Sequence, residues 1–517
     1  MDNQLFKKFD YYWILLILTV ILCYGFFLTN HSMGIDDEFL TVFSNPQVIM
    51  ITNRPGNFIF SHVLQTYEYL PFWREFLGIA LYTFGITLHS ENFMKYLESK
   101  FDKKSATIFS VIAVSFPYLA FHFLFIENML QHGFIMIFTA LAVRYFYKFF
   151  LQEKTKSNFI LVLISLFFAA SFYESAVYYF VISCLIIEFL KFIFNKSEKF
   201  YNRVFFMCLF SFLCVSINVL ICEIMKKIMH INYSKIDDFL LYDISSFSSF
   251  LKSFVNLQGA FIHKFIATCE YNFGSVIALI SIIVFILFSL VYAFKKKNFN
   301  VIICSIFIIL VPFSSLLILG NEAMPFRSYV PLSFLVALVF CLLFNQFKEK
   351  KVITNIVIAL SIMVVVYNAQ EQNQIYYIEN LKYEDDKHFA YSIMYDLKKL
   401  RVDNKPIIFV GLKENPLLKY EYIESDEINI STFNWDRYDS FNAEIFVGRP
   451  YAFFKELGFE IKAFSDIRFD SSSEYETLLT EIRRNTKEME IYPREDSIRD
   501  IGEYVIIKIG KSRADIE

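Results

Sequence analysis

Apolar residues come in long unbroken runs over about the first 370 positions of the chain. A helix that crosses a bilayer needs about 20 consecutive, mostly apolar residues, and most of these runs approach or reach that length. The first run is long and is followed by no small-residue cleavage site, so we interpret it as a permanent span. The pattern predicts about eleven spans, at about residues 11–29, 71–90, 106–126, 130–149, 158–175, 176–194, 204–224, 272–294, 300–320, 327–347 and 352–368.

Basic residues follow these runs in a regular alternation. A lysine pair precedes the first run, and clusters of Lys or Arg follow each even-numbered run. Cytoplasmic loops carry an excess of Lys and Arg, which places the N-terminus inside and the segment beyond about residue 370 outside. The long loop 225–271 departs from the rule, because Lys226 and Lys227 open it although it should be external. Its mixed polar and apolar pattern, like that of residues 38–65, favours helices lying in the outer interface.

The composition agrees with a polytopic membrane protein. Hydrophobic residues make up 56% of the 517 positions, with 64 Phe and 32 Tyr, and the mean hydropathy is +0.43. Lys and Arg (49) nearly balance Asp and Glu (52), so the charge does not indicate a nucleic-acid partner. The eight cysteines lie mostly in apolar runs, which indicates neither a disulfide framework nor a zinc site.

Beyond Gln370 the long apolar runs stop and charged residues become dense. Residues 391–400 have the pattern of an amphipathic helix, and "KPIIFVG" (405–411), "AEIFVG" (443–448) and "EYVIIKIG" (503–510) are typical of short buried strands. We therefore predict a polytopic α-helical membrane domain over residues 1–369 and an extracytoplasmic α/β domain over 370–517. The second domain contains no nucleotide-binding or metalloprotease motif.

Polar residues gather at the outer ends of the predicted spans and are nearly absent at mid-membrane depth. An ion-coupled transporter would need such residues near the midplane, so the pattern argues against one. It favours instead a site at the outer boundary between water and lipid. The residues concerned are Asp36, Asp37, His122, Glu127, Asn128, Gln131, His132, Tyr173, Glu174, Glu223, Asn321, Glu322 and Arg327.

Several short motifs, in this order, resemble a known family. The Asp36–Asp37 pair in the first external loop is followed by the Arg-containing turn "TNRPGNF" (52–58), then by "SFYESAVYYF" (171–180) and "MPFRSYVPLSFLVAL" (324–338). This arrangement resembles the bacterial and phage O-antigen glucosyltransferases (Gtr type II) and, more broadly, glycosyltransferases of the GT-C fold that use polyprenyl-phosphate donors. The family often has a Gly-Arg pair in its first loop, where this chain has Asn53-Arg54.

The resemblance implies an integral enzyme of the bacterial inner membrane. Such an enzyme takes a sugar, glucose or another hexose, from a polyprenyl-phosphate donor on the outer leaflet. It passes the sugar to a hydroxyl of a cell-surface glycan. Its expected partners are this donor, the glycan acceptor and membrane lipid, together with an upstream enzyme that makes the donor and a flippase that turns it outward.

The acidic pair suits this chemistry. Inverting transfer needs one carboxylate to accept the proton of the acceptor hydroxyl, and repulsion between neighbouring carboxylates raises the proton affinity of one of them. We therefore expect Asp36 or Asp37 to be the general base. Two alternatives stay open: the pair caps an interfacial helix, or it binds a divalent metal, for which two carboxylates would leave most of the coordination shell to water.

Two arginines are candidates for binding the donor phosphate. Arg54 and Arg327 each offer a planar fork of donors that suits a phosphate oxyanion. Arg54 could instead anchor the chain at lipid headgroups, and Arg327 could instead pair with Glu322.

Four further residues are candidates for the sugar or acceptor site: Tyr173, Glu174, Glu127 and His132. Glu174 lies between apolar neighbours at a hairpin tip, where a buried polar group needs a partner. His132 follows Asn128 by one helical turn, and Gln131 follows Glu127 likewise, so two polar pairs stack on one helix. A hydrated helix end would explain these two pairs as well as a binding site does.

Two other classes of protein could also have a polytopic chain of this kind. A transporter or flippase of lipid-linked sugars would also be polytopic, but it predicts polar residues through the membrane depth. A membrane scaffold with an external binding domain would leave the Asp pair and the arginines unexplained.

Overall fold

The computed structural model describes residues 11–34, 37, 54–63, 72–97, 100–194, 199–231, 248–249, 251–252, 255, 274–314, 326–414, 428–434, 449–463 and 472–511. The side chains of residues 127 and 472–476 lie outside this description. The chain divides into two compact units at Gln374 and Ile375. Unit 2 also includes residues 30–34 and 37 from the N-terminal part of the chain.

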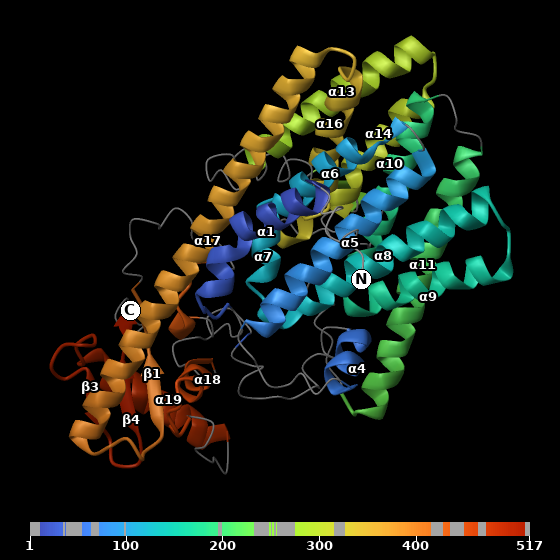
Figure 1. Ribbon diagram of the computed structural model, residues 1–517. Coiled ribbons are helices and arrows are strands. Elements are labelled where there is room, and N and C mark those ends of the chain that lie inside the picture. Colours follow the sequence, from blue (N-terminus) through green and yellow to red (C-terminus); the bar gives the residue numbers. More distant parts are fainter. Residues whose placement is uncertain are drawn as a thin grey trace, which may run out of the picture. The chain divides into compact units, whose positions relative to one another are not determined.

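Unit 1 is built from helices, many of which pack side by side (Figure 1). Its α-helices are α1 (Tyr11–Thr29), α4 (Pro55–Val63), α5 (Trp73–Leu97), α6 (Lys103–Ser115), α7 (Tyr118–Phe123), α8 (Ile126–Leu151), α9 (Lys156–Phe172), α10 (Ala176–Ile193), α11 (Phe200–Ile228), α13 (Ser275–Lys296), α14 (Asn300–Leu310), α16 (Leu332–Gln346) and the first half of α17 (Lys351–Leu400). Two 3₁₀ turns, η5 (Val311–Phe313) and η6 (Phe326–Tyr329), flank residues outside the described part.

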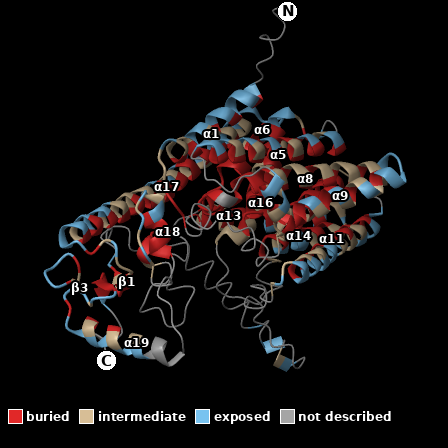
Figure 2. Cartoon of the chain, turned by 90° about the horizontal axis from the view of Figure 1, so that it is seen from below, coloured by how far each residue is buried: buried red, intermediate tan, exposed pale blue. Residues whose placement is uncertain are grey.

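Six described helices are long and apolar enough to cross a membrane: α1, α8, α10, α11, α13 and α17. Buried residues gather where the helices meet, as the burial colouring shows (Figure 2). Large apolar side chains such as Leu18, Phe212, Leu287 and Met363 stay exposed on the outer faces. An apolar surface of this extent is typical of helices that face lipid. Unit 1 therefore has the character of a membrane protein, and the count of about eleven spans stays a prediction.

Some predicted spans differ from the helices in the structure. The predicted span 106–126 is interrupted after Ser115, because Phe116 is extended ahead of Pro117 and proline disfavours helical geometry in the preceding residue. The first piece, α6, has 13 residues and is about 20 Å long, shorter than the hydrocarbon core. In the opposite sense, the predicted span 352–368 and amphipathic helix 391–400 belong to one 50-residue helix, α17, which contains neither Gly nor Pro.

Helices α5 and α8 lie side by side (Figure 1), and glycines on each helix let larger residues of the other come close to its backbone. A Cβ atom added to Gly85 would lie 2.4 Å from Met136 Cβ, and one added to Gly133 would lie 2.5 Å from Leu81 Cβ. Small residues allow membrane helices to pack backbone against backbone. This contact fixes α8, whose other face carries the polar residues of the candidate site.

We expect Gly85→Ala to destabilise the protein, because the added methyl group has no room against α8. Overpacking of this kind costs about 1–3 kcal/mol. Gly25→Ala is the matched control, since its Cβ would meet only Ile21 Cγ2 at an ordinary 3.9 Å. The thermal unfolding midpoint in detergent should fall for Gly85→Ala and not for Gly25→Ala. Equal midpoints for the two variants would contradict the close contact.

Unit 2 is a small α/β unit around one hydrophobic core. Buried strands β1 (Ile407–Val410) and β4 (Val505–Lys508) pair in parallel, and β3 (Ile498–Asp500) pairs with β4 in antiparallel. The second half of α17, α18 (Arg449–Glu456) and α19 (Ser472–Lys487) complete it, with a short pair of strands, β2 (Leu412–Lys413) and β5 (Gly510–Lys511). The first and last predicted strands contain β1 and β4, whereas the predicted strand 443–448 lies outside the described residues.

Candidate functional site

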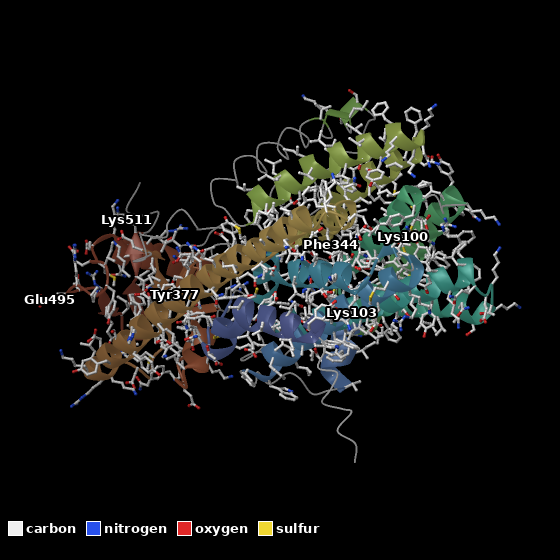
Figure 3. All side chains as sticks on the ribbon, turned by 45° about the horizontal axis from the view of Figure 1, so that its top comes forward. Lys100, Lys103, Phe344, Tyr377, Glu495 and Lys511 are labelled. Carbon is white, nitrogen blue, oxygen red and sulfur yellow. The ribbon has the colours of Figure 1, made fainter. Side chains whose placement is uncertain are left out.

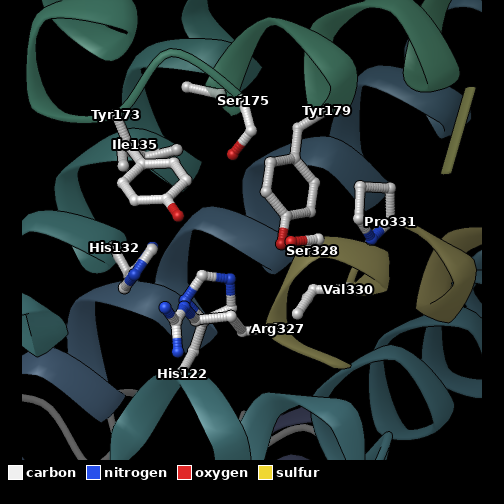
Figure 4. A pocket seen from close by; sticks show the side chains of 11 residues that line it. His122, His132, Ile135, Tyr173, Ser175, Tyr179, Arg327, Ser328, Val330 and Pro331 are labelled. Atoms are coloured by element: carbon white, nitrogen blue, oxygen red, sulfur yellow. The ribbon is translucent and has the colours of Figure 1, made fainter. Parts of the chain in front are cut away.

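A narrow pocket lies among the helix ends of unit 1 (Figure 4). It has room for about one water molecule, so a sugar ring requires side chains to move apart. Seven of its eleven lining residues have polar side chains, in contrast to the apolar helices that support them. The lining consists of His122, His132, Ile135, Tyr173, Ser175, Ala176, Tyr179, Arg327, Ser328, Val330 and Pro331.

Helix α8 presents one polar face to this region. Asn128, Gln131, His132 and Ile135 follow the spacing of one helical face, which is distinct from the stripe that packs on α5. The His132 ring lies 3.9 Å from the ring of His122, which comes from α7 (Figure 4). The two imidazoles thus form a buried pair at one end of the pocket.

Arg54 is placed beside the pocket by the short helix α4. Pro55 begins this helix, as proline favours the first helical position. The Arg54 guanidinium lies 4.4 Å above the centre of the Tyr173 ring, and Nη1 donates a long hydrogen bond of 3.5 Å to Asn128 Oδ1. The Arg54 Nε atom is buried with no hydrogen-bond partner, which leaves a donor for a ligand.

Two further contacts hold α4 in place. Gln131 Nε2 donates to Asn57 Oδ1 at 2.6 Å, which ties α4 to α8. A Cβ atom on Gly56 would lie 2.2 Å from Ser171 Oγ, so this glycine lets α4 press against α9. The position of Arg54 therefore depends on residues from three different helices.

Glu174 sits beside Tyr173 in the turn between α9 and α10, and its Oε1 atom is buried without a hydrogen-bond partner. Burial raises the pKa of its carboxyl group, whereas the positive charges of Arg54 and Lys226 act in the opposite direction. An unpaired carboxylate oxygen is costly in a low-dielectric environment. A ligand hydroxyl that donates a hydrogen bond to this oxygen would remove the cost.

The structure places Lys226 in an environment different from the predicted one. The sequence favoured a loop over 225–271, but Lys226 belongs to the last turn of α11 and is buried. Its Nζ atom lies 3.6 Å from Glu223 Oε1 and has no hydrogen-bond partner. The helix runs further because no Gly or Pro interrupts residues 200–228. Lys226 adds a second cation near Glu174, besides Arg54.

Arg327 reaches the pocket from η6. Its guanidinium lies 4.4 Å above the Phe125 ring, and the His122 imidazole hydrogen-bonds the Arg327 backbone. Figure 4 shows Arg327 beside the two histidines. Glu322, the alternative partner of Arg327, lies outside the described residues. Four segments that are well separated in the sequence thus come together in unit 1: they contribute Arg54, His132, Tyr173 with Glu174, and Arg327.

The acidic pair is described in part. Asp36 lies outside the described residues, as does the side chain of Glu127. Asp37 is buried in unit 2, where its Oδ2 accepts the Gly34 N–H at 2.9 Å, and its own N–H donates to Gly34 O at 3.3 Å. A side chain that accepts the N–H of the residue three positions before it makes half of a helix capping box, with Gly34 in the N-cap position. Whether Asp36 or Asp37 is itself an N-cap stays a prediction. Among the described residues, no cluster of three or more His, Cys, Asp or Glu could hold a metal.

Residues 31–34 are anchored within unit 2 by α17. Asn380 Nδ2 donates to His31 O at 3.0 Å, and Lys382 Nζ donates to Met33 O at 3.0 Å. Met33 is buried in the core of the unit, and the Lys382 Nζ atom also pairs with the buried Glu379 at 2.7 Å. The segment leading to the acidic pair therefore folds as part of the C-terminal unit.

We expect Lys382→Gln to loosen residues 31–34. A hydrogen bond from a charged donor contributes about 1.5–3 kcal/mol, so amide exchange at Gly34 should rise on the order of tenfold or more. Lys413→Gln is the matched control, because this lysine is also buried in unit 2 but pairs with Asp386, at 2.7 Å. If both variants exchange alike at Gly34, Lys382 has no specific role in holding the segment.

The sequence did not single out every residue that lines the pocket. Ser175, Tyr179 and Ser328 were missed, although Tyr179 follows Ser175 by one helical turn and Ser328 follows Arg327 directly. Hydroxyl residues in apolar helices are common, so their spacing alone carried little signal. Their role in the pocket emerges from the meeting of α10 with η6.

The pocket is lined by two histidines, Tyr173 and Arg327, and Arg54 and the buried carboxylate of Glu174 lie beside Tyr173. In a chain with apolar helices long enough to cross a membrane, this region is a candidate site for an anionic, hydroxyl-rich ligand. The sequence model of one family, described as "Glucosyl transferase GtrII", matches residues 25–345. This match covers more than half of the chain, so the chain belongs to the GtrII glucosyltransferase family. Membership implies a glucosyltransferase associated with the membrane. No curated protein and no solved structure gives a significant match.

Proposed function

We propose that the chain transfers glucose or another hexose from a polyprenyl-phosphate donor to a cell-surface glycan on the outer face of the membrane. The observation that supports this most is the gathering of Arg54 and Arg327 around Tyr173 and the two histidines, in a chain of the GtrII family. Both guanidinium charges act on His132, so the pocket has the positive character that a lipid phosphate needs.

The proposed reaction is a single displacement. The acceptor hydroxyl attacks the anomeric carbon of the sugar while its proton passes to the carboxylate of Asp36 or Asp37. The bond between the anomeric carbon and the phosphate oxygen breaks, and its electron pair leaves with the lipid phosphate. Arg54 and Arg327 stabilise the charge on this leaving group. The carboxylate then returns its proton to water.

The remaining candidates would hold the sugar or the acceptor. Glu174 has a buried carboxylate oxygen without a partner, which suits a sugar hydroxyl, and the Tyr173 ring offers an apolar face next to it. His132 and Glu127 lie on the helix that faces these residues. A divalent metal at Asp36 and Asp37 stays the alternative to general-base catalysis.

The function can be tested on cells and on the purified protein. Deleting the gene should lower the mass of the surface glycan by one hexose per repeating unit. In nanodiscs, the protein should move labelled glucose from a synthetic polyprenyl-phosphate glucose to the isolated glycan. If the label instead crosses the bilayer of sealed vesicles with the donor intact, the protein is a flippase and the proposal fails.

The proposal also requires the acidic pair and the C-terminal unit to lie outside the cytoplasmic membrane, with the N-terminus inside. A tag after Glu517 should then be accessible to protease in spheroplasts, and a tag before Asp2 should become accessible only after lysis. Protection of the C-terminal tag would overturn this orientation and the assignment of the acidic pair to the outer face.

A further inference from the structure

The second half of α17 carries an open groove in unit 2 that lies beyond the residues matched by the family. The groove has a volume of about 480 Å³, within the range of small-molecule sites. It is far roomier than the pocket in unit 1. Its wall combines aromatic, hydroxyl, imidazole and carboxylate side chains: His388, Tyr391, Ser392, Tyr395, Asp396 and Tyr492.

The helical spacing explains how this wall forms. His388, Tyr391, Ser392, Tyr395 and Asp396 are separated by three or four residues along α17 and so share one face. The other face of the same turns carries fully buried residues of the unit's core, among them Ala390, Ile393 and Leu397. The outer face of such an amphipathic helix is normally charged. Here it presents two tyrosine rings, with Tyr391 45% and Tyr395 70% exposed.

Several of these side chains are held in place by their neighbours. The Tyr391 ring packs edge-on against Phe459, with 5.3 Å between the ring centres. Tyr492 donates its hydroxyl to Asp396 Oδ2 at 2.8 Å, which fixes the carboxylate at the edge of the groove. A wall with ordered side chains loses less entropy when a ligand binds.

The chemistry of the wall selects the ligand. No Lys or Arg is among the described residues that line the groove, and Asp396 contributes a negative charge, which disfavours phosphates and other anions. A sugar ring offers C–H groups on one face and hydroxyls at its edge. Tyrosine faces suit the first, and the carboxylate, imidazole and serine hydroxyl suit the second.

We propose that this groove binds a neutral, hydroxyl-rich segment of the acceptor glycan, away from the atoms that react. The identity of the ligand rests on the proposed transfer to a surface glycan. The groove would hold the polymer on unit 2 and so raise its concentration near the enzyme, as a second binding module does. The residues of the groove are binding residues and have no catalytic part.

The test uses the full chain in nanodiscs, with the isolated, lipid-free surface polysaccharide of the source cells as probe. Tyr391→Ala combined with Tyr395→Ala should weaken binding about tenfold, because two stacking surfaces are lost. Tyr395→Phe should bind as the wild type does. Tyr377→Ala is the matched control, since Tyr377 is 43% exposed and also projects from α17 but does not line the groove (Figure 3).

Binding and transfer are measured separately, so the two proposals can fail independently. Weakened binding in the double variant supports the groove even if no sugar transfer is detected, in which case the proposed function alone fails. If transfer occurs, the double variant should raise KM for the polymer and leave kcat unchanged. Unaltered binding in the double variant, or an equal loss in Tyr377→Ala, overturns the groove whatever the transfer assay gives.

Discussion

Replacing the general base by asparagine should lower the rate of sugar transfer by on the order of 10²- to 10⁴-fold. Asp36→Asn and Asp37→Asn each keep the shape of the side chain and remove its proton acceptor. We expect the larger loss at Asp36, because it comes first in the chain after the predicted span. The measurement is transfer of labelled sugar, normalised to the amount of protein in the membrane.

Asp37 provides its own control for a structural role. Its Oδ2 accepts the Gly34 N–H, and an asparagine oxygen can accept the same bond, so Asp37→Asn should preserve the fold. Asp37→Ala removes the acceptor and should cost about 1 kcal/mol of stability, as loss of a helix cap does. If both asparagine variants transfer sugar at the wild-type rate, the pair only caps a helix and the proposed base is wrong.

The second large effect is expected at Arg54. Arg54→Lys keeps the positive charge but loses the planar fork and the contact with the Tyr173 ring. Removing one donor to a developing oxyanion costs on the order of 10²- to 10³-fold in rate. We expect a loss of this size in kcat/KM for the donor, measured with the polyprenyl-phosphate sugar in nanodiscs.

Arg144→Lys is a suitable comparison for Arg54→Lys. Arg144 pairs with Glu91 at 3.0 Å and with Asn92, away from the pocket in unit 1. This variant should transfer sugar at nearly the wild-type rate. Arg54→Lys with unchanged donor kinetics would indicate that Arg54 only anchors the chain at lipid headgroups.

The membrane character and the family could be predicted from the sequence because their signals are local. A long apolar run by itself indicates an apolar environment, and a family motif can be recognised from a few neighbouring residues. The same logic found the strands around Ile407 and Val505. It was less reliable at span ends, where a single residue such as Pro117 breaks a helix within an apolar run.

The charge pattern predicted the ends of helices less well than the apolar runs predicted the membrane character. Lys226 was assigned to an external loop, but α11 continues to Ile228 and buries its side chain. A lysine at the end of an apolar run fits both a loop and a last helical turn. Which of the two forms depends on the helices packed against it, among them α4 and α9.

What the sequence determined by itself is the membrane character of the chain, its membership in a glucosyltransferase family and the polar residues worth examining. Only the tertiary structure decided which of these residues meet: Arg54, Tyr173, His132 and Arg327 are brought together by contacts among helices far apart along the chain. It also decided that residues 31–34 fold with the C-terminal unit. The physical reason is that packing between distant segments depends on the shapes of both segments. The local sequence of one segment does not indicate which other segment will pack against it.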